Sequence, residues 1–343
     1  MAKSSAVVQL VQCHQSGWYF KWFCMKKNFT YRRKKLEARQ LEVFTQLINA
    51  ASEQANAPNP DTQPLNAKPQ KLSSKLRLIE AAECVLFETF CQVTTNLNAL
   101  RTSDDPEVVH QARVGWRRFK SALRLFKPVI AADTAPSWQD LELLLTCLGD
   151  LRDLDVAIAE TLPTLADAYA QGDELRIEKW QTMEKVLLDA TQLQRKTVRY
   201  ALQEPAVGLC LQTTAEWIDA LCTSNNANTK TDKKTHLRYW SRTRIARLFR
   251  QLRDAQAKAD SPIGQHRVRI IIKRIRYSIE MLQTLLPKRR SDKWLRKARQ
   301  QQLNSGAVRD TMQASTLLSK LDVEPQIVEF VRGFAIGKQG MVA

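Results

Sequence analysis

The chain has 343 residues, of which 44% are hydrophobic, and its 53 Lys and Arg outnumber its 35 Asp and Glu to give a formal net charge of +18. The length and the hydrophobic fraction are sufficient for a sizeable core in two or three domain-sized units. They exclude a protein that is only a charged, unfolded tail. The charge favours an anionic partner. It is unevenly spread, because residues 236–299 hold 19 basic and 4 acidic residues (+15), whereas residues 128–235 hold 10 basic and 17 acidic residues (−7).

The cysteines and the hydropathy exclude further classes of protein. The seven cysteines form no CxxC pair and no regular spacing with histidine, so we expect neither a metal site nor a disulfide framework, and a reducing cytosol is the simplest compartment. No run approaches the roughly 18 apolar residues that a transmembrane helix needs.

Residues 1–70 are predicted to be an N-terminal extension followed by a linker. The stretch SGWYFKWFCMKKNFTYRRKK mixes aromatic and basic residues, without the continuous apolar run of a signal peptide. It is interpreted either as a segment that contacts a membrane surface or a polyanion or, as the favoured interpretation, as a poorly ordered extension. A short helical pattern at 36–50 is followed by NAPNPDTQPLNAKPQ, which is typical of a linker. The folded domain is expected to begin near Lys71.

From residue 71 onward the chain is predicted to be all-α. Glycine and proline are scarce, and apolar residues recur at intervals of three and four, as in amphipathic helices. A long helix over KLRLIEAAECVLFETFCQVTTNLNAL precedes a second helix, for which Asp104 is the expected N-cap, with Pro106 and Glu107 in the first turn. Further helices are expected at 138–148, 151–170, 173–201, 206–222, 236–257, 262–285, 291–303, 306–321 and 325–334.

Two motifs occur twice, in the same order and with nearly the same displacement. HQARVGWRRFKSALRLF at 110–126 and HRVRIIIKRIRYSIEML at 266–282 share a histidine followed by basic residues at +3, +7, +8 and +10, with an offset of 266 − 110 = 156. About 40 residues after each histidine, G-x-x-R-D occurs at 149–153 and at 306–310, with an offset of 306 − 149 = 157. We interpret this pattern as a duplicated helical unit.

In each copy the basic residues form one stripe and the apolar residues another. At about 100° per residue, positions 0, +3, +7, +10 and +14 fall within a sector about 80° wide. The apolar positions +2, +6, +9, +13 and +16 lie about 120° away and are expected to pack into a bundle. The basic stripe of the first copy consists of His110, Arg113, Arg117, Lys120 and Arg124.

The basic stripes differ from an ordinary solvated helix face, which usually interleaves acids with bases. The first stripe has no acid, and the second has only Glu280, at +14. Cations stacked one per turn, about 5.4 Å apart, repel one another unless an anion relieves them. We therefore interpret the stripes as an anion-binding face. His110 and His266 are assigned to this face without a catalytic role, because no base or carboxylate lies at a convincing spacing.

The paired H-x-x-R-x-x-x-[RK]-R-x-[RK] helices, together with LGDLRDLDVAI and LNSGAVRDTMQA, resemble the CHAD family, the conserved histidine α-helical domain. The resemblance covers about residues 71–335, divided into a first repeat at about 71–225 and a second at about 230–335, with a tail at 336–343. It implies two four-helix bundles related by a pseudo-twofold axis around a central basic pore. It also implies binding of inorganic polyphosphate and association with polyphosphate granules.

The stripes and the resemblance together predict a set of polyphosphate-binding residues, with no catalytic residue, no metal and no cofactor. This set is His110, Arg113, Arg117, Arg118, Lys120, Arg124, His266, Arg269, Lys273, Arg274 and Arg276. Weaker candidates are Arg242, Arg250 and Arg253 on the preceding helix and Arg296 and Arg299 on the following one.

Other residues near the two histidine helices match or depart from the family pattern. Tyr277 and Glu280 match the RYxxE that follows the second histidine in the family. Gly115 and Trp116 depart from the small or hydroxylated pair that is common in the family, which bears on local packing more than on charge.

The predicted function is non-catalytic polyphosphate binding in the cytoplasm, at polyphosphate granules, with other granule proteins as further candidate partners. A nucleic-acid-binding protein is the first alternative, although the stripes lack interleaved aromatic residues and show no DNA- or RNA-binding motif. A polyphosphate- or phosphate-ester-processing enzyme is the second, although the acids are scattered. Residues 1–70 are also too short and too poor in acids for the triphosphate-processing domain of some CHAD proteins. A granule scaffold is the third alternative, and it is compatible with binding.

Overall fold

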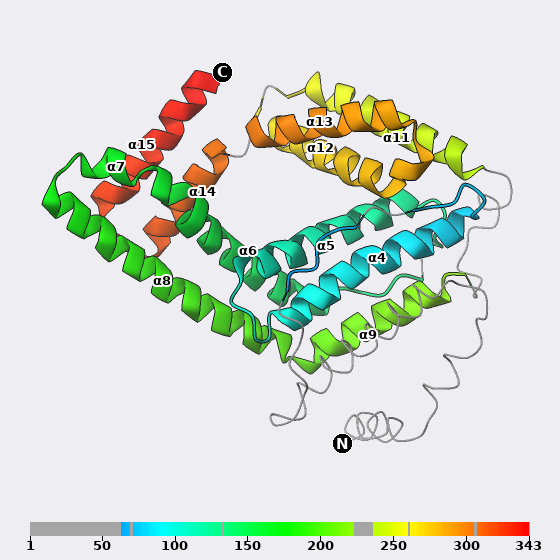
Figure 1. Cartoon of the computed structure of the whole chain (residues 1–343), viewed down its shortest axis with the longest axis horizontal. Helices are drawn as coiled ribbons and strands as arrows, with labels where there is room; N and C mark the ends of the chain where they lie inside the picture. Colours follow the sequence, from blue (N-terminus) through cyan, green and yellow to red (C-terminus); the bar gives the residue numbers. More distant parts are fainter. Residues whose placement is uncertain are drawn as a thin grey trace. The chain divides into compact units, whose positions relative to one another are not determined.

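The structure, a computed structural model, describes residues 63–68, 71–131, 134–222, 236–259, 261–304 and 307–342. The helices and turns of these ranges include no strand, which confirms the predicted all-α class (Figure 1). Nearly all of the predicted N-terminal extension lies outside the described residues, and so does Gly306 of the second G-x-x-R-D motif. None of the helices in these ranges combines the length and apolar character of a membrane span.

The α-helices follow one another in an order close to that predicted. They are α4 (Leu78–Ala99), α5 (Pro106–Phe126), α6 (Glu142–Val156), α7 (Ala166–Ala170), α8 (Glu174–Leu202), α9 (Pro205–Ala220), α11 (Leu237–Gln256), α12 (Pro262–Leu282), α13 (Lys288–Asn304), α14 (Ala307–Lys320) and α15 (Pro325–Val342). Short helical segments are η1 (Gln139–Leu141), η2 (Ala157–Thr161), η3 (Leu162–Thr164) and η4 (Gln283–Leu285).

The N-cap residue of α5 lies one position later in the sequence than predicted. The side chain of Asp105, not Asp104, caps the helix by accepting a hydrogen bond from the backbone N–H of Glu107 at 2.8 Å. Pro106 occupies the first turn, where its missing N–H costs nothing. Asp104 instead forms an ion pair with Arg199 of α8 at 2.7 Å. The prediction of Asp104 was wrong because two adjacent aspartates satisfy the same sequence pattern.

The predicted break near residue 149 is absent. Helix α6 continues through Gly149 and then passes directly into η2, a five-residue π-helical segment. A glycine inside a helix weakens it but does not end it when tertiary contacts hold both sides. Leu148 and Leu151, on either side of the glycine, are both buried in the core, and they provide those contacts.

Two hydrophobic clusters form the core, and each takes helices from both repeats. The first contains residues of α4, α5, α9, α11, α12 and α13, and the second contains residues of η2, α7, α14 and α15. Helices α6 and α8 contribute residues to both clusters. Helices α4 and α5 pack together in the first cluster, as do α11 and α12. Helix α5 also contacts α12, and α6 contacts α14, so the repeats meet along these two pairs (Figure 1).

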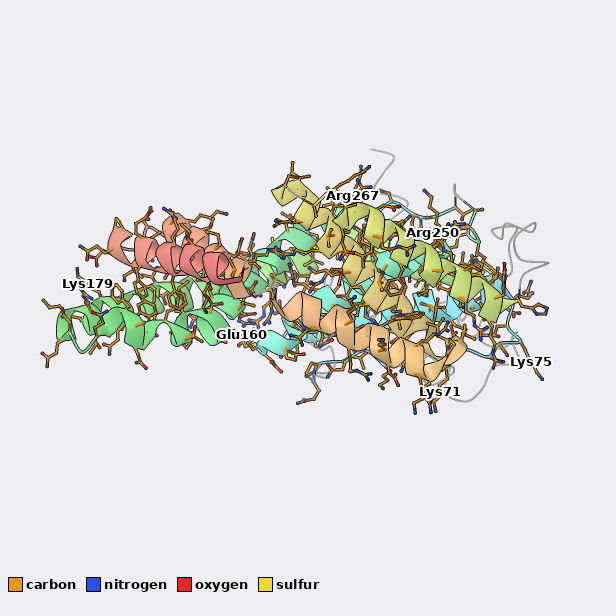
Figure 2. The ribbon with its side chains drawn as sticks, turned by 90° about the horizontal axis from the view of Figure 1, so that it is seen from above. Lys71, Lys75, Glu160, Lys179, Arg250 and Arg267 are labelled. Atoms are coloured by element: carbon orange, nitrogen blue, oxygen red, sulfur yellow. The ribbon has the colours of Figure 1, made fainter. Side chains whose placement is uncertain are left out.

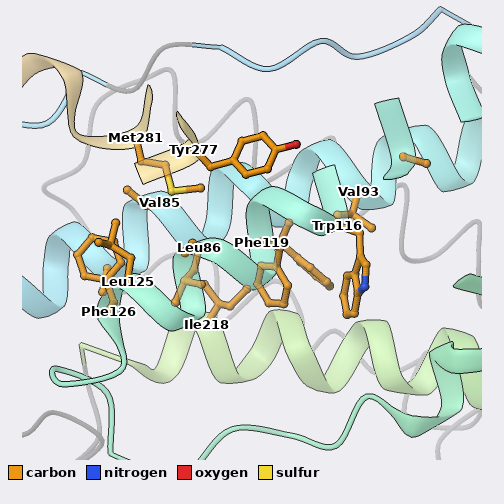
Figure 3. Packing of buried hydrophobic residues seen from close by; sticks show 14 of the residues in the cluster. Val85, Leu86, Val93, Trp116, Phe119, Leu125, Phe126, Ile218, Tyr277 and Met281 are labelled. Carbon is orange, nitrogen blue, oxygen red and sulfur yellow. The ribbon is translucent and has the colours of Figure 1, made fainter. Parts of the chain in front are cut away.

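The unusual Gly115–Trp116 pair lies where α5 crosses α4 and faces α9. A Cβ atom at Gly115 would lie 3.0 Å from the backbone nitrogen of Val93, so glycine allows this close approach without displacing the backbone of α4. The Trp116 ring stacks on Phe119, with centroids 5.7 Å apart, and both rings point toward α9 (Figure 3). The departure from the family pattern therefore serves the core.

The helix bounds fit the duplication inferred from the sequence. Helix α12 begins 262 − 106 = 156 residues after α5 begins, and it ends 282 − 126 = 156 residues after α5 ends. The pseudo-twofold relation between two four-helix bundles stays a prediction.

Candidate functional site: a basic cluster between the two repeats

The basic stripe of α5 runs from a half-buried end to an exposed end. His110, Arg113 and Arg117 are half-buried, whereas Lys120 and Arg124 are exposed. On the apolar stripe, Trp116 and Phe119 are buried in the core. The two stripes therefore do what their angular separation predicts, because one anchors the helix and the other remains accessible.

Lys273 of α12 lies at the centre of the basic residues that the two repeats bring together. Burial, followed by the positive charges of Arg117, Arg309, Arg269 and Arg276, lowers the pKa of Lys273 to about 8. Arg117 comes from α5, Arg309 from α14, and the others from α12. An ammonium group with four cationic neighbours is the arrangement that the sequence interpretation anticipated for an anion-binding face.

Arg113 is held against α6 by the glycine of the first G-x-x-R-D motif. A Cβ atom at Gly149 would lie only 2.8 Å from Nη1 of Arg113, so the missing side chain makes room for the guanidinium. Burial, followed by the charge of Arg117, lowers the pKa of Arg113, and its buried Nε has no hydrogen-bond partner among the residues that the structure describes. Asp153 lies close enough to oppose that shift, and its Oδ2 accepts a hydrogen bond from Nε2 of Gln313 on α14 at 3.1 Å.

The arginines of the two G-x-x-R-D motifs also belong to this site, although they were not predicted as ligands. Arg152 lowers the pKa of His110, after the larger effect of burial, and it forms an ion pair with Glu160 at 2.7 Å (Glu160 is labelled in Figure 2). Arg309 likewise lowers the pKa of Arg269, again after burial. The repetition of the motif was the signal that could have identified both arginines.

We define the basic cluster by the residues of α5, α6, α12 and α14 that these charge effects connect. Its members are His110, Arg113, Arg117, Arg152, Arg269, Lys273, Arg276 and Arg309. Because burial and neighbouring cations lower the pKa of His110 below its usual 6.5, its imidazole is neutral near pH 7 and can donate one hydrogen bond.

A second group of cations continues along the exposed end of α5. Arg124 lowers the pKa of Arg274, after burial, and Arg274 and Arg247 have the same effect on Arg244. Nη2 of Arg244 donates hydrogen bonds to the carbonyl oxygens of Arg124 and Leu125, at 3.2 and 3.0 Å. Arg244 therefore caps the last turn of α5, where a cation is favoured. Lys120, between the two groups, lies 5.9 Å from the ring of Trp116.

Arg118, predicted as a polyphosphate ligand, is buried and contacts side chains of α4. Its side chain is only 3% exposed and contacts both carboxylate oxygens of Glu88 on α4, with Nη2 to Oε2 at 3.1 Å and Nη1 to Oε1 at 3.3 Å. Nη1 also donates a hydrogen bond to the side chain of Gln92. These contacts hold both terminal nitrogens of the guanidinium within the α4–α5 interface, while its buried Nε has no hydrogen-bond partner among the described residues. A phosphate would therefore have to compete with Glu88 and Gln92 for this group.

The other predicted residues of α12 and α13 have mixed surroundings. Arg276 forms an ion pair with Glu280 at 3.4 Å and lies 4.9 Å from the ring of Tyr277, so RYxxE is a local contact group. The lining of a cavity of about 530 Å³ includes the basic residues Lys68, His110, Arg118, Arg276 and Arg296 and the acids Glu280 and Asp292. The two acids weaken its attraction for a polyanion.

The remaining predicted residues lie away from the basic cluster or outside the described side chains. His266, the counterpart of His110, is exposed near the start of α12. Arg242 and Arg253 line a separate cavity between α11, α12 and α13. Arg250 is exposed on α11 (Figure 2). The side chain of Arg299 falls outside the described residues.

Within the ranges that the structure covers, no three His, Cys, Asp or Glu side chains are grouped closely enough to hold a metal ion. Two acids near the basic cluster contact basic or amide groups: Glu160 pairs with Arg152, and Asp153 accepts a hydrogen bond from Gln313.

Comparison with known proteins agrees with this fold and with the sequence motifs. Residues 84–319 match the CHAD domain. The crystal structure of the CHAD domain from the plant Ricinus communis is similar, with a TM-score of 0.67 and 26% identity over 81% of this chain and 92% of that one. PptA from Streptomyces chartreusis shares the fold, with a TM-score of 0.51 and 13% identity over 78% of this chain and 95% of that one. No curated protein matched. Because the family match spans more than half of the sequence, the chain belongs to the CHAD domain family.

Proposed function

We propose that this chain binds inorganic polyphosphate through the basic cluster, without catalysing a reaction on it, and that it is located at polyphosphate granules in the cytoplasm. The observation that carries the proposal is the surroundings of Lys273, which lies near four arginines drawn from both repeats. Such an arrangement is unfavourable in the free protein and becomes favourable when a polyanion lies among the cations.

Polyphosphate fits the chemistry of the cluster better than other anions do. It is a linear polymer with closely spaced negative charges and no bases, so its receptor needs an array of cations and no aromatic stacking surface. Arginine provides two parallel hydrogen bonds to phosphate oxygens, and lysine adds a compact charge. The cluster has both types, and the group formed by Arg124, Arg244, Arg247 and Arg274 continues it along α5.

A competition experiment tests the proposal against a nucleic-acid-binding role. Labelled polyphosphate is bound to the full-length protein and displaced with unlabelled polyphosphate or with duplex DNA at equal phosphate concentration. We expect polyphosphate to displace the label at an about tenfold lower concentration than DNA, and binding to weaken steeply between about 50 and 200 mM salt. Displacement by DNA that is equal or better would contradict the proposal and favour nucleic acid.

The lowered pKa of Lys273 predicts a pH-dependent affinity. In the free protein Lys273 loses its proton at about pH 8 instead of at 10.5, and a bound polyanion raises this pKa again. Binding should therefore take up a proton near pH 8, and affinity should fall as the pH rises from 7 to 9.

In the free protein, the folded-state pKa of Lys273 lies below the unfolded-state pKa, so the contribution of Lys273 to stability rises between pH 8 and 10.5.

Isothermal titration calorimetry in two buffers of different ionisation enthalpy measures that proton uptake directly. Lys273→Arg is the matched control, because a guanidinium stays protonated over this range. The variant should bind with little dependence on pH. If it shows the same decline as the original protein, Lys273 is not the group that titrates on binding.

A further inference from the structure

A groove of about 890 Å³ lies between α11, α12 and α13, separate from the residues of the basic cluster. Figure 2 looks onto this part of the molecule, with α11 and α13 on either side of α12. Its apolar lining includes Phe249, Leu252, Ile272, Ile275 and Trp294. Its basic lining consists of Arg242, Arg253, Arg290 and Lys297, and no acidic side chain is among the lining residues of the described chain.

The duplication shows what occupies the equivalent place in the first repeat. With the offset of 156 residues, Ile272, Ile275 and Trp294 correspond to Trp116, Phe119 and Trp138. These three aromatic residues pack against one another and against α9: Nε1 of Trp138 donates a hydrogen bond to Oγ1 of Thr214 at 3.1 Å, and the ring of Trp138 lies 6.5 Å from that of Trp217. Figure 3 shows Trp116 and Phe119 directed toward α9.

The same offset relates the groove side of α11 to α4, which contacts α9 in the first repeat. Leu86, Phe90, Val93 and Leu97 of α4 are all buried. Their counterparts at +156 are Arg242, Ala246, Phe249 and Arg253, and all four line the groove. The groove is thus the second-repeat equivalent of the surface that α9 covers, with two leucines replaced by arginines. No described helix covers it.

We infer that this groove receives an amphipathic α-helix of a partner protein, with an apolar face on the half-buried rings of Phe249 and Trp294 and with carboxylates directed at Arg242 and Arg253. The internal comparison indicates a helix as the occupant, because a helix fills the equivalent place in the first repeat. The charge of the lining selects acidic partners, since cations around an apolar surface attract a helix with acidic flanks and repel a basic one. Arginine at such positions also favours interface formation.

A peptide with the sequence of residues 204–222 is a suitable probe. It is apolar along one face, contains Glu204, Glu216 and Asp219, and has no basic side chain. We expect the fluorescently labelled peptide to bind the full-length protein. Arg242→Glu with Arg253→Glu should weaken this binding at least about tenfold. Ala246→Trp, which fills the groove without changing charge, should abolish it. Arg250→Glu with Arg267→Glu, which reverses two charges at exposed positions of α11 and α12 outside the groove lining, is the matched control and should leave the affinity within about twofold.

Three outcomes would overturn the inference. If the peptide does not bind, or if the groove variants bind it as well as the original protein does, the groove is not a helix receptor. If polyphosphate displaces the peptide in direct competition, the groove is a further polyanion surface. If light scattering shows a dimer that Ala246→Trp dissociates, the occupant is a second copy of this chain. The polyphosphate affinity of the groove variants is measured separately, so that a failure of the peptide experiment can be distinguished from a failure of the proposed function.

Discussion

Simultaneous replacement of Arg117 and Lys273 by glutamate should abolish polyphosphate binding. The two residues come from different repeats and lie close enough for Arg117 to lower the pKa of Lys273. The double substitution converts two attractive charges in the cluster into two repulsive ones, and we expect the affinity to fall by about a hundredfold or more. The helical circular dichroism signal should be unchanged, because both side chains are only half-buried and neither anchors the core.

A matched control separates the loss of a site from the loss of overall charge. Lys185→Glu with Lys196→Glu changes the net charge by the same amount at exposed positions of α8. This variant should keep an affinity within about threefold of the original protein, since distant exposed charges are screened by salt. An equal loss of binding in both double variants would show that polyphosphate responds to net charge and not to the cluster.

Replacement of Glu88 by alanine should strongly destabilise the fold. Glu88 neutralises the buried guanidinium of Arg118, and removal of one partner of a buried ion pair leaves an uncompensated charge, which costs about 3 kcal/mol. Chemical denaturation of the variant should show this decrease in the free energy of unfolding. The double variant Glu88→Met with Arg118→Met should recover most of the lost stability, because neither charge then remains buried.

The Arg118→Met variant also tests whether Arg118 is a ligand. The terminal nitrogens of Arg118 donate hydrogen bonds to Glu88 and Gln92. Replacement of Arg118 should therefore leave polyphosphate affinity nearly unchanged in protein that is still folded. A large loss of affinity without a loss of stability would restore Arg118 to the binding site. The measurement is fluorescence anisotropy at a temperature well below the unfolding transition of the variant.

The features predicted best from the sequence are those that depend on local periodicity. The two stripes of α5 and their repetition in α12 follow from residue spacing, and the structure confirms their helical form and equal length. Arg118 shows what this reasoning leaves out, because a basic residue in the motif was counted without regard to its direction. It lies about 120° from the middle of the basic stripe, on the side where α4 supplies Glu88.

Other features of the site require the tertiary structure. The repeated G-x-x-R-D motif singles out Arg152 and Arg309, but their place in the cluster depends on α6 and α14 lying beside α5 and α12, which spacing along the chain does not show. The role of Gly149 also depends on residues far apart in the sequence. The absence of a side chain at this position makes room for the guanidinium of Arg113, 36 residues earlier (149 − 113 = 36). The sharing of each core by both repeats also could not be read from the sequence, because each helix shows that it has an apolar face but not which helix covers it.

The mixed composition of the two cores determines the order in which the protein can fold during synthesis. Helices α5 and α6 find their partners α12 and α14 only after more than a hundred further residues have been made. Until then the faces they share remain open to water and to other chains, and the long separation slows closure. A single copy of the duplicated unit has the same open faces, so it could cover them only by pairing with another copy. The fused chain makes that pairing intramolecular and independent of protein concentration.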